Sequence, residues 1–204
     1  YLRDFVSTPV SLLNTRRIGG TANQVEVPEG VSLDRGQRDV PTDLLGAAKV
    51  TGAVGDVRYG VLGAVEDEAL WLGSKMVHAP FDLTGDDLWS GGGTHSTPIE
   101  VTGDGRDFGV ARLIYENVGD TRRSVGYMGT FVGGPVYDAT VHSVDGHFTS
   151  GSGKLIADAQ IITSERSEEQ GYGGVFDLMY NVAPNLSHKF EIDYMDENIN
   201  FNDL

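Results

Sequence analysis

The feature that most constrains this chain is a period of two in its apolar residues. In Leu186–Asp196, apolar side chains alternate with polar ones, and the polar set includes Lys189, Glu191 and Asp193. Successive side chains of a β-strand point to opposite faces, so this pattern predicts a strand with one apolar and one charged face. The preceding segment, Gly174–Val182, alternates in the same way, and the intervening Ala-Pro-Asn is typical of a tight turn. The two segments together predict a β-hairpin.

The same alternation recurs upstream and predicts about nine strands, joined mainly as sequential hairpins. In addition to the final hairpin, strands are expected at Val10–Arg17, Leu44–Thr51, Val57–Glu66, Phe108–Asn117, Ser124–Val132, Tyr137–His147 and Lys154–Ser164. The facing of Phe108–Asn117 stays open, because Arg112 falls among apolar neighbours. Most connections are expected to be short, with long loops over residues 19–42 and 67–107.

Composition excludes several other kinds of protein. Glycine makes up 28 of 204 residues, which disfavours a helical fold. The absence of cysteine excludes disulfide frameworks and thiolate zinc sites. A net charge of -15 argues against nucleic acid as a partner, because phosphate binding requires a basic surface. No run of 18 apolar residues predicts a transmembrane helix, but transmembrane strands are too short for that test to find.

The second face of the predicted strands separates two all-β architectures. It carries small and charged residues, whereas the apolar face carries tyrosine and phenylalanine near the strand ends. Small or polar inward residues and terminal aromatic residues are typical of transmembrane barrels. We therefore expect an antiparallel up-and-down meander of about 8–9 strands that forms all or part of a transmembrane β-barrel, with residues 1–204 in one domain. The charged residues expected to face the lumen are Lys49, Arg58, Asp158, Lys189, Glu191 and Asp193.

Three stretches resemble a known family. They are Arg16-Arg17-Ile18-Gly19, the hairpin sequence over 45–65 that contains Leu45-Gly46-Ala47-Ala48-Lys49 and Tyr59-Gly60-Val61-Leu62-Gly63, and the final stretch from Tyr194 to Asn202-Asp203-Leu204. In this order they resemble the bacterial outer-membrane barrel family called domain of unknown function 5916. The resemblance covers nearly the whole chain except the 67–107 region.

The resemblance implies a location in the bacterial outer membrane and a non-enzymatic role in transport or surface binding. Family members usually carry an N-terminal module that resembles family 9 carbohydrate-binding modules, which suggests a link to carbohydrate handling. That module is not present in these 204 residues. We expect the chain to be part of a larger barrel, with outer-membrane lipid as its partner.

The alternative interpretation is a soluble extracellular β-sandwich that binds glycans. Trp71, Phe81 and Trp89 in the expected long loop would then stack on sugar rings. No catalytic motif, cofactor motif or dedicated metal-ligand spacing is evident, so we expect no enzyme activity, no cofactor and no metal site. Acidic runs such as Glu66-Asp67-Glu68 would bind divalent cations only loosely.

Overall fold

The fold consists almost entirely of strands. The computed structural model describes residues 8–21, 25–78 and 94–201. These residues form eleven strands and two short 3-10 helices, η1 (Thr15–Arg17) and η2 (Gln37–Asp39). Within the same residues, no helix is long and apolar enough to cross a membrane. The prediction of an all-β protein is confirmed.

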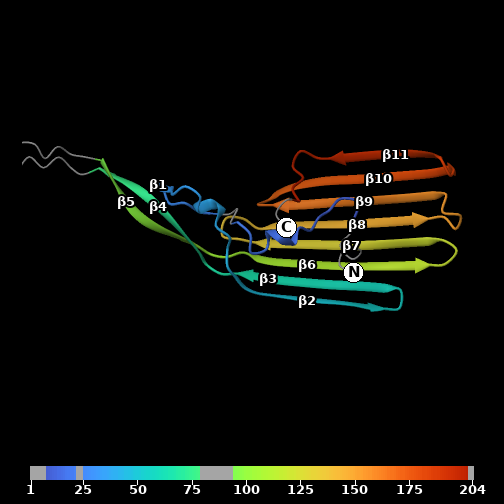
Figure 1. Ribbon diagram of the computed structural model, residues 1–204, viewed down its shortest axis with the longest axis horizontal. Coiled ribbons are helices and arrows are strands. Elements are labelled where there is room, and N and C mark those ends of the chain that lie inside the picture. Colours follow the sequence, from blue (N-terminus) through green and yellow to red (C-terminus); the bar gives the residue numbers. More distant parts are fainter. Residues whose placement is uncertain (1–7, 22–24, 79–93, 202–204) are drawn as a thin grey trace, which may run out of the picture.

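Eight of the strands form one antiparallel sheet in the order β11-β10-β9-β8-β7-β6-β3-β2 (Figure 1). Neighbours in the sheet are neighbours along the chain, apart from the β3–β6 step, so the predicted meander is confirmed. In the described residues β2 pairs only with β3 and β11 only with β10, so the sheet is open and no closed barrel is seen. The strands are β2 (Leu44–Val54), β3 (Val57–Glu66), β6 (Asp107–Val118), β7 (Arg122–Gly133), β8 (Ala139–Thr149), β9 (Leu155–Arg166), β10 (Glu169–Ala183) and β11 (Leu186–Met195).

A smaller sheet extends from one end of the large one. It contains β1 (Val31–Leu33), β4 (Ala69–His78) and β5 (Thr94–Gly103), in the order β1-β4-β5. β4 follows β3 and β5 precedes β6, so the β4–β5 hairpin projects beyond the eight-stranded sheet (Figure 1).

The long loops expected over residues 19–42 and 67–107 are therefore corrected. The described part of 67–107 is a strand pair, and 19–42 contains β1 and η2. Local glycine and acidic residues suggested loops, but the ladder between β4 and β5 is set by pairing across the hairpin rather than by composition. The strand expected at Val10–Arg17 is also wrong, because this segment lies over the sheet instead of joining it (Figure 1).

Register divides the eight-stranded sheet into two faces, since residues directly opposite in an antiparallel ladder share a face. The inner face includes Ala64, Phe108, Val132 and Ala139, which lie side by side on β3, β6, β7 and β8. The outer face carries the alternate residues of each strand, for example Val61 on β3. The facing of β6, which the sequence left open, is thereby settled: Arg112 is on the inner face, opposite Gly60 and Met128.

The hydrophobic core lies on the inner face, under the N-terminal segment 8–20. Leu12 of this segment is 1% exposed and belongs to a cluster with inner-face residues of β3 and β6–β9. The members of the cluster are Leu12, Ala64, Phe108, Val110, Met128, Val132, Val141 and Ile162. An irregular segment therefore covers this face of the sheet and completes its core, as a second layer of helices or strands does in most domains.

The segment after β11 also folds back onto the inner face. Ile199 packs against the core cluster, and a Cβ on Gly171 would lie 2.3 Å from its backbone nitrogen. The Asn200 backbone N–H donates to the Ser164 hydroxyl at 2.9 Å. Residues 196–201 therefore cover the β9–β10 part of the face, beside the N-terminal segment.

We expect Leu12→Ala to lower the free energy of unfolding by about 2–5 kcal/mol, because it leaves a cavity between the N-terminal segment and the sheet. Leu45→Ala is the matched control: Leu45 is 65% exposed, so its loss should change stability by less than about 0.5 kcal/mol. Chemical denaturation of the two variants measures the difference. Equal losses would contradict the role assigned to Leu12.

Candidate functional site

The inner face bears a polar groove beyond the end of the core cluster. Its volume is about 470 Å³, and Thr8 and Pro9 form its boundary with the N-terminal segment. Charged side chains from β3 to β10 line it, and neighbouring strands contribute them at nearly the same level of the ladder. Because the strands fix the spacing, these charges meet as cross-strand pairs.

The central pair joins Arg112 on β6 to Asp145 on β8, two strands away. Arg112 donates through both terminal nitrogens, and Nη2 lies 2.9 Å from Asp145 Oδ2. The Arg112 side chain is only 2% exposed. Gly126 on β7 lies between the partners, and a Cβ there would come within 2.7 Å of Arg112 Nη2. Glycine at this position therefore lets the guanidinium pass over β7.

Two further sets of contacts, with five residues in all, lie nearer the strand ends. Glu116 accepts from Arg58 at 2.8 Å and from Arg122 at 2.7 Å. On the neighbouring strands His147 Nδ1 lies 2.6 Å from Asp158 Oδ1. The Glu116 contacts link β3, β6 and β7, and the His147–Asp158 contact separately links β8 and β9.

The inner-face charges are segregated by sign across the sheet. Lys49, Arg58, Arg112 and Arg122 lie on β2, β3, β6 and β7, accompanied by the carboxylates Glu66 and Glu116. Carboxylates predominate on the other half, from β8 to β11, where they are Asp145, Asp158, Glu169, Asp177, Glu191 and Asp193, with Arg166 and Lys189 as the cations among them. A polar solute in the groove would therefore lie between a basic and an acidic wall.

A buried ion pair lies at the opposite end of the inner face, where β3 ends and β6 begins. Arg106 donates from Nε to Glu66 Oε2 at 2.8 Å and from Nη2 to Glu66 Oε1 at 2.9 Å. The two side chains are 4% and 1% exposed. The guanidinium also lies 5.1 Å from the centre of the Phe108 ring. Glu66 is therefore not a solvent-exposed member of an acidic run, and it is not available to a loosely bound cation.

This pair holds the Arg16-Arg17-Ile18-Gly19 stretch against the sheet. The Gly19 N–H donates to Glu66 Oε1 at 2.8 Å, and Arg106 Nη2 donates to the Arg17 carbonyl at 3.3 Å. Gly19 has φ +68°, a conformation that favours glycine. The contact gives a physical reason for glycine at position 19, because the backbone there adopts a positive φ while its N–H binds a buried carboxylate.

Register places the six predicted lumen residues on one face. Lys49, Arg58, Asp158, Lys189, Glu191 and Asp193 all occupy inner-face positions. Arg58 and Asp158 line the polar groove, whereas Lys49 and the three β11 residues lie toward the two sheet edges. Whether this face borders a lumen stays a prediction.

The aromatic residues expected to bind glycans are not assembled into a site. Trp71 is 2% exposed, and a Cβ on Gly103 would lie 2.8 Å from its ring, so it packs within the small sheet and cannot stack on a sugar. This corrects the prediction for Trp71. Phe81 and Trp89 lie outside the described residues.

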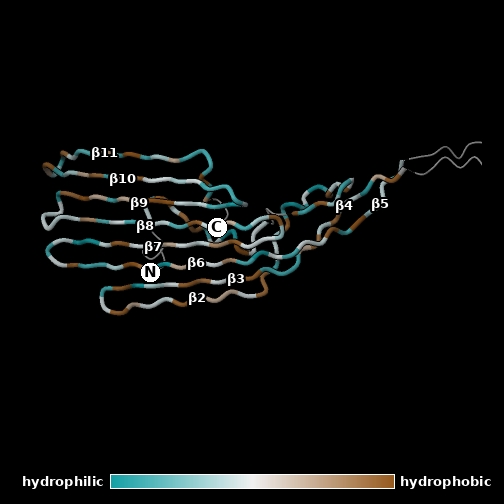
Figure 2. Tube along the Cα trace, turned by 180° about the vertical axis from the view of Figure 1, so that it is seen from behind, coloured by the Kyte–Doolittle hydropathy of each residue, from teal (hydrophilic) through white to brown (hydrophobic). Residues whose placement is uncertain are grey.

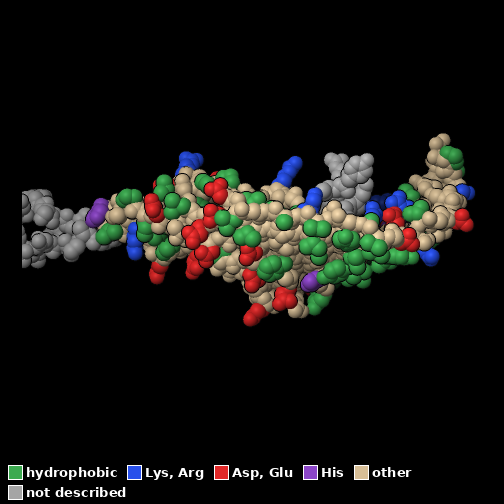
Figure 3. Space-filling view, turned by 90° about the horizontal axis from the view of Figure 1, so that it is seen from below, with side chains coloured by type: hydrophobic (Ala, Val, Ile, Leu, Met, Phe, Trp, Pro, Cys, Tyr) green, Lys and Arg blue, Asp and Glu red, His purple; other side chains and the backbone are tan. Residues whose placement is uncertain are grey.

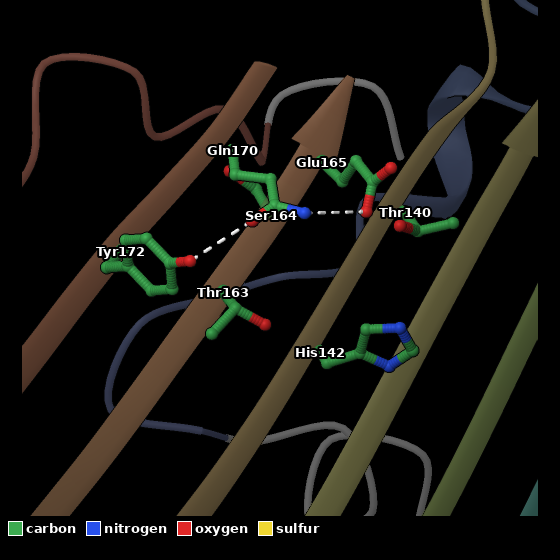
Figure 4. A pocket seen from close by; sticks show the side chains of 7 residues that line it. All are labelled: Thr140, His142, Thr163, Ser164, Glu165, Gln170 and Tyr172. Carbon is green, nitrogen blue, oxygen red and sulfur yellow. Dashed lines mark hydrogen bonds between the residues drawn. The ribbon is translucent and has the colours of Figure 1, made fainter. Parts of the chain in front are cut away.

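A smaller cavity of about 250 Å³ lies near one end of β8, β9 and β10 (Figure 4). Tyr172 Oη donates to Gln170 at 3.1 Å, and Gln170 Nε2 lies 3.4 Å from Glu165. His142 in the same cavity contacts Tyr127 Oη at 2.8 Å. These outer-face groups form a polar border beside the exposed apolar residues. The described part of the chain holds no cluster of three or more His, Cys, Asp or Glu suited to a metal ion.

Several groove residues were not singled out from the sequence. Asp145, His147 and Glu116 become prominent only when register brings them to the partners on neighbouring strands. The sequence holds one signal for Arg112. It is an odd number of positions away from Leu113 and Tyr115, so in a strand it lies on the opposite face from these exposed apolar residues. The pairing of Glu66 with Arg106, 40 residues away, had no local signal.

Comparison with known proteins gives no further identification. No protein-family model matches the chain. No curated protein matches it, and no solved structure matches it.

We expect Glu66→Gln to destabilise the fold by about 3–5 kcal/mol, because it leaves the Arg106 guanidinium buried without its counter-charge. The loosened segment should also be cleaved faster by trypsin after Arg16 and Arg17. Glu68→Gln, at a neighbouring exposed position, serves as the control and should change neither measurement. A Glu66→Met, Arg106→Met double variant should lose less stability than Glu66→Gln, since both charges are removed. An unchanged cleavage rate in Glu66→Gln would contradict the contact.

Proposed function

We propose that this chain forms wall strands of a β-barrel in a bacterial outer membrane, and that its role is transport of polar solutes rather than catalysis. The observation that carries the proposal is the outer face of the eight-stranded sheet. Among the described strands, its only Lys, Arg, Asp or Glu residues are Asp107, Arg123 and Glu165, all within two positions of a strand end.

The rest of this face is apolar and exposed. Figure 3 shows a continuous area of hydrophobic side chains along the lower side of the sheet, and Figure 2 shows the mixed hydropathy of the strands that carry them. A soluble monomer rarely exposes so large an apolar area. Its large exposed members include Val50, Val54, Tyr59, Val61, Val65, Leu113, Tyr115, Val125, Tyr127, Phe131, Val144, Ile161, Tyr172, Phe176, Tyr180, Leu186, Phe190, Ile192 and Tyr194.

Strand length and aromatic placement fit a bilayer. The eight strands have 10 to 15 residues, and a tilted transmembrane strand needs about 9–11. Tyr115 and Tyr180 lie toward one end of the sheet, and Phe131 and Tyr172 toward the other. Aromatic side chains at both levels are typical of the two membrane interfaces.

The connections support an orientation. At one end of the sheet the turns are short, as at the β2–β3 and β10–β11 junctions, whereas the β4–β5 hairpin projects from the other end. Outer-membrane barrels have short periplasmic turns and longer extracellular loops. We therefore place the projecting hairpin outside the cell, where it would also serve surface binding.

The groove favours polar solutes without specifying sugars. Its walls are charged and hydrogen-bonded, and no Phe, Tyr or Trp is among the described residues that line it. Stacking platforms for sugar rings are therefore missing there. The link to carbohydrate handling rests on the family resemblance. The glycan-binding sandwich has less support, because the two described sheets lie end to end rather than face to face (Figure 1).

Membrane partitioning tests the proposal directly. Produced behind a bacterial export signal, the chain should sediment with outer membranes, resist extraction by urea and show heat-modifiable migration in gels. Recovery of a folded, monodisperse monomer without detergent would refute the proposal.

A pair of neighbouring substitutions on β2 tests which face meets lipid. Val50 lies on the outer face and Thr51 on the inner face, and both are exposed. We expect Val50→Arg to reduce folding stability in lipid bilayers by about 2–4 kcal/mol, because it buries a charge in hydrocarbon. Thr51→Arg should lose less than half as much. The readout is reversible unfolding in liposomes, and equal losses from the two variants would argue against a lipid-facing outer surface.

A further inference from the structure

The inner-face carboxylates are all paired within the strands from β3 to β9, but not at the β11 edge of the sheet. Within the strands from β3 to β9, each inner-face carboxylate has a cationic or imidazole partner, as described above for Glu66, Glu116, Asp145 and Asp158. At the β11 edge the balance changes.

Where β10 and β11 lie beside one another, Lys189 is the one cation of the described inner face near three carboxylates, Asp177, Glu191 and Asp193, and it pairs with the first two. Lys189 contacts Glu191 and lies 3.9 Å from Asp177. Asp193, two residues further along β11, makes no ion pair within 4 Å among the described residues. At the other edge, Lys49 on β2 likewise has no ion pair in the described chain. Asp193 and Lys49 are thus without ion-pair partners on the two strands that have a neighbour on one side only in the described sheet.

Pairing of β11 with β2 of the same copy would bring these opposite charges together, but the interior does not allow it. An eight-stranded barrel has an interior just wide enough for its own side chains. Here the inner face already holds two irregular backbone segments, 8–20 and 196–201, with Leu12 and Ile199 packed in the core. Closure at eight strands would require both segments to leave.

Building on the proposed function, we propose that β11 pairs with an additional antiparallel strand whose outer side chains are apolar and whose inner side chains, opposite Glu191 and Asp193, are Lys or Arg. Three observations point to this partner. The β11 edge presents unpaired backbone groups, which hydrocarbon does not tolerate. Its outer face continues the apolar area through Phe190, Ile192 and Tyr194. Its inner face carries excess negative charge.

Two synthetic peptides test the charge requirement. Both have ten residues that alternate with valine, one with lysine and the other with glutamate at the inner positions. They are added to the full chain in neutral detergent, and backbone amide exchange is followed on β11. The lysine peptide should protect β11 amides with an affinity at least tenfold above that of the glutamate peptide.

A Glu191→Lys, Asp193→Lys variant should reverse this preference, because both residues are exposed at the edge and their replacement leaves the core intact. Lys49→Glu, on the other edge, is the matched control and should leave protection of β11 by the lysine peptide unchanged. Equal protection by both peptides, or no reversal in the double variant, would overturn the proposal.

Disulfide trapping tests the competing closures. The chain has no native cysteine, so cysteines placed at position 47, 49 or 51 on β2 and at 189, 191 or 193 on β11 report only on these edges. We expect no disulfide in any combination. A β2–β11 disulfide, within one chain or between two copies, would overturn the proposal. Only variants that still enter liposomes are compared, so a failure of strand pairing is distinguished from a failure of membrane insertion.

Discussion

The two faces of the eight-stranded sheet require different surroundings, and most of the structure follows from this difference. Alternation sends valine, isoleucine and tyrosine to the outer face and charged or small residues to the inner face. A sheet in water normally covers its apolar face with a second layer. Here the packed layer lies on the other side, over the polar and mixed face, and the apolar side stays open.

That packed layer is irregular chain, which raises the problem of satisfying its backbone. Buried N–H and C=O groups without partners are costly. Three inner-face side chains solve it: Gln160 Oε1 accepts from the Val10 N–H at 2.6 Å, Glu66 accepts from Gly19, and Ser164 accepts from Asn200. Their burial would be unfavourable in an ordinary core. Here the burial of these three side chains is explained by the two segments that cross the inner face. The backbone N–H groups of these segments are not paired in a strand ladder, so side chains accept from them.

Much of the fold was predictable because alternation is a local property. The pattern Val57, Tyr59, Val61 against Arg58, Gly60 specified both a strand and its facing, and the register agrees. The prediction failed where local composition and distant pairing disagree. Residues 69–78 lie beside glycine-rich and acidic stretches that suggest a loop, yet they pair with 94–103.

The candidate site was predictable only in part, for a related reason. Parity identifies which residues share a face, so the six charged residues could be grouped from sequence. It does not say which of them meet, because contacts such as Arg112 with Asp145 span an intervening strand and depend on glycine at 126. Glu66 and Trp71 were misread because burial is decided by residues far away in the chain.

The position of the Glu66–Arg106 pair has a mechanical consequence. Glu66 is the last residue of β3, Arg106 directly precedes β6, and only short links lead from them to β4 and β5. The root of the projecting hairpin and the anchor of the N-terminal segment are therefore the same two side chains. The Glu66 carboxylate thus couples the two elements directly, since it accepts from Gly19 of the N-terminal segment and from Arg106 at the root of the hairpin.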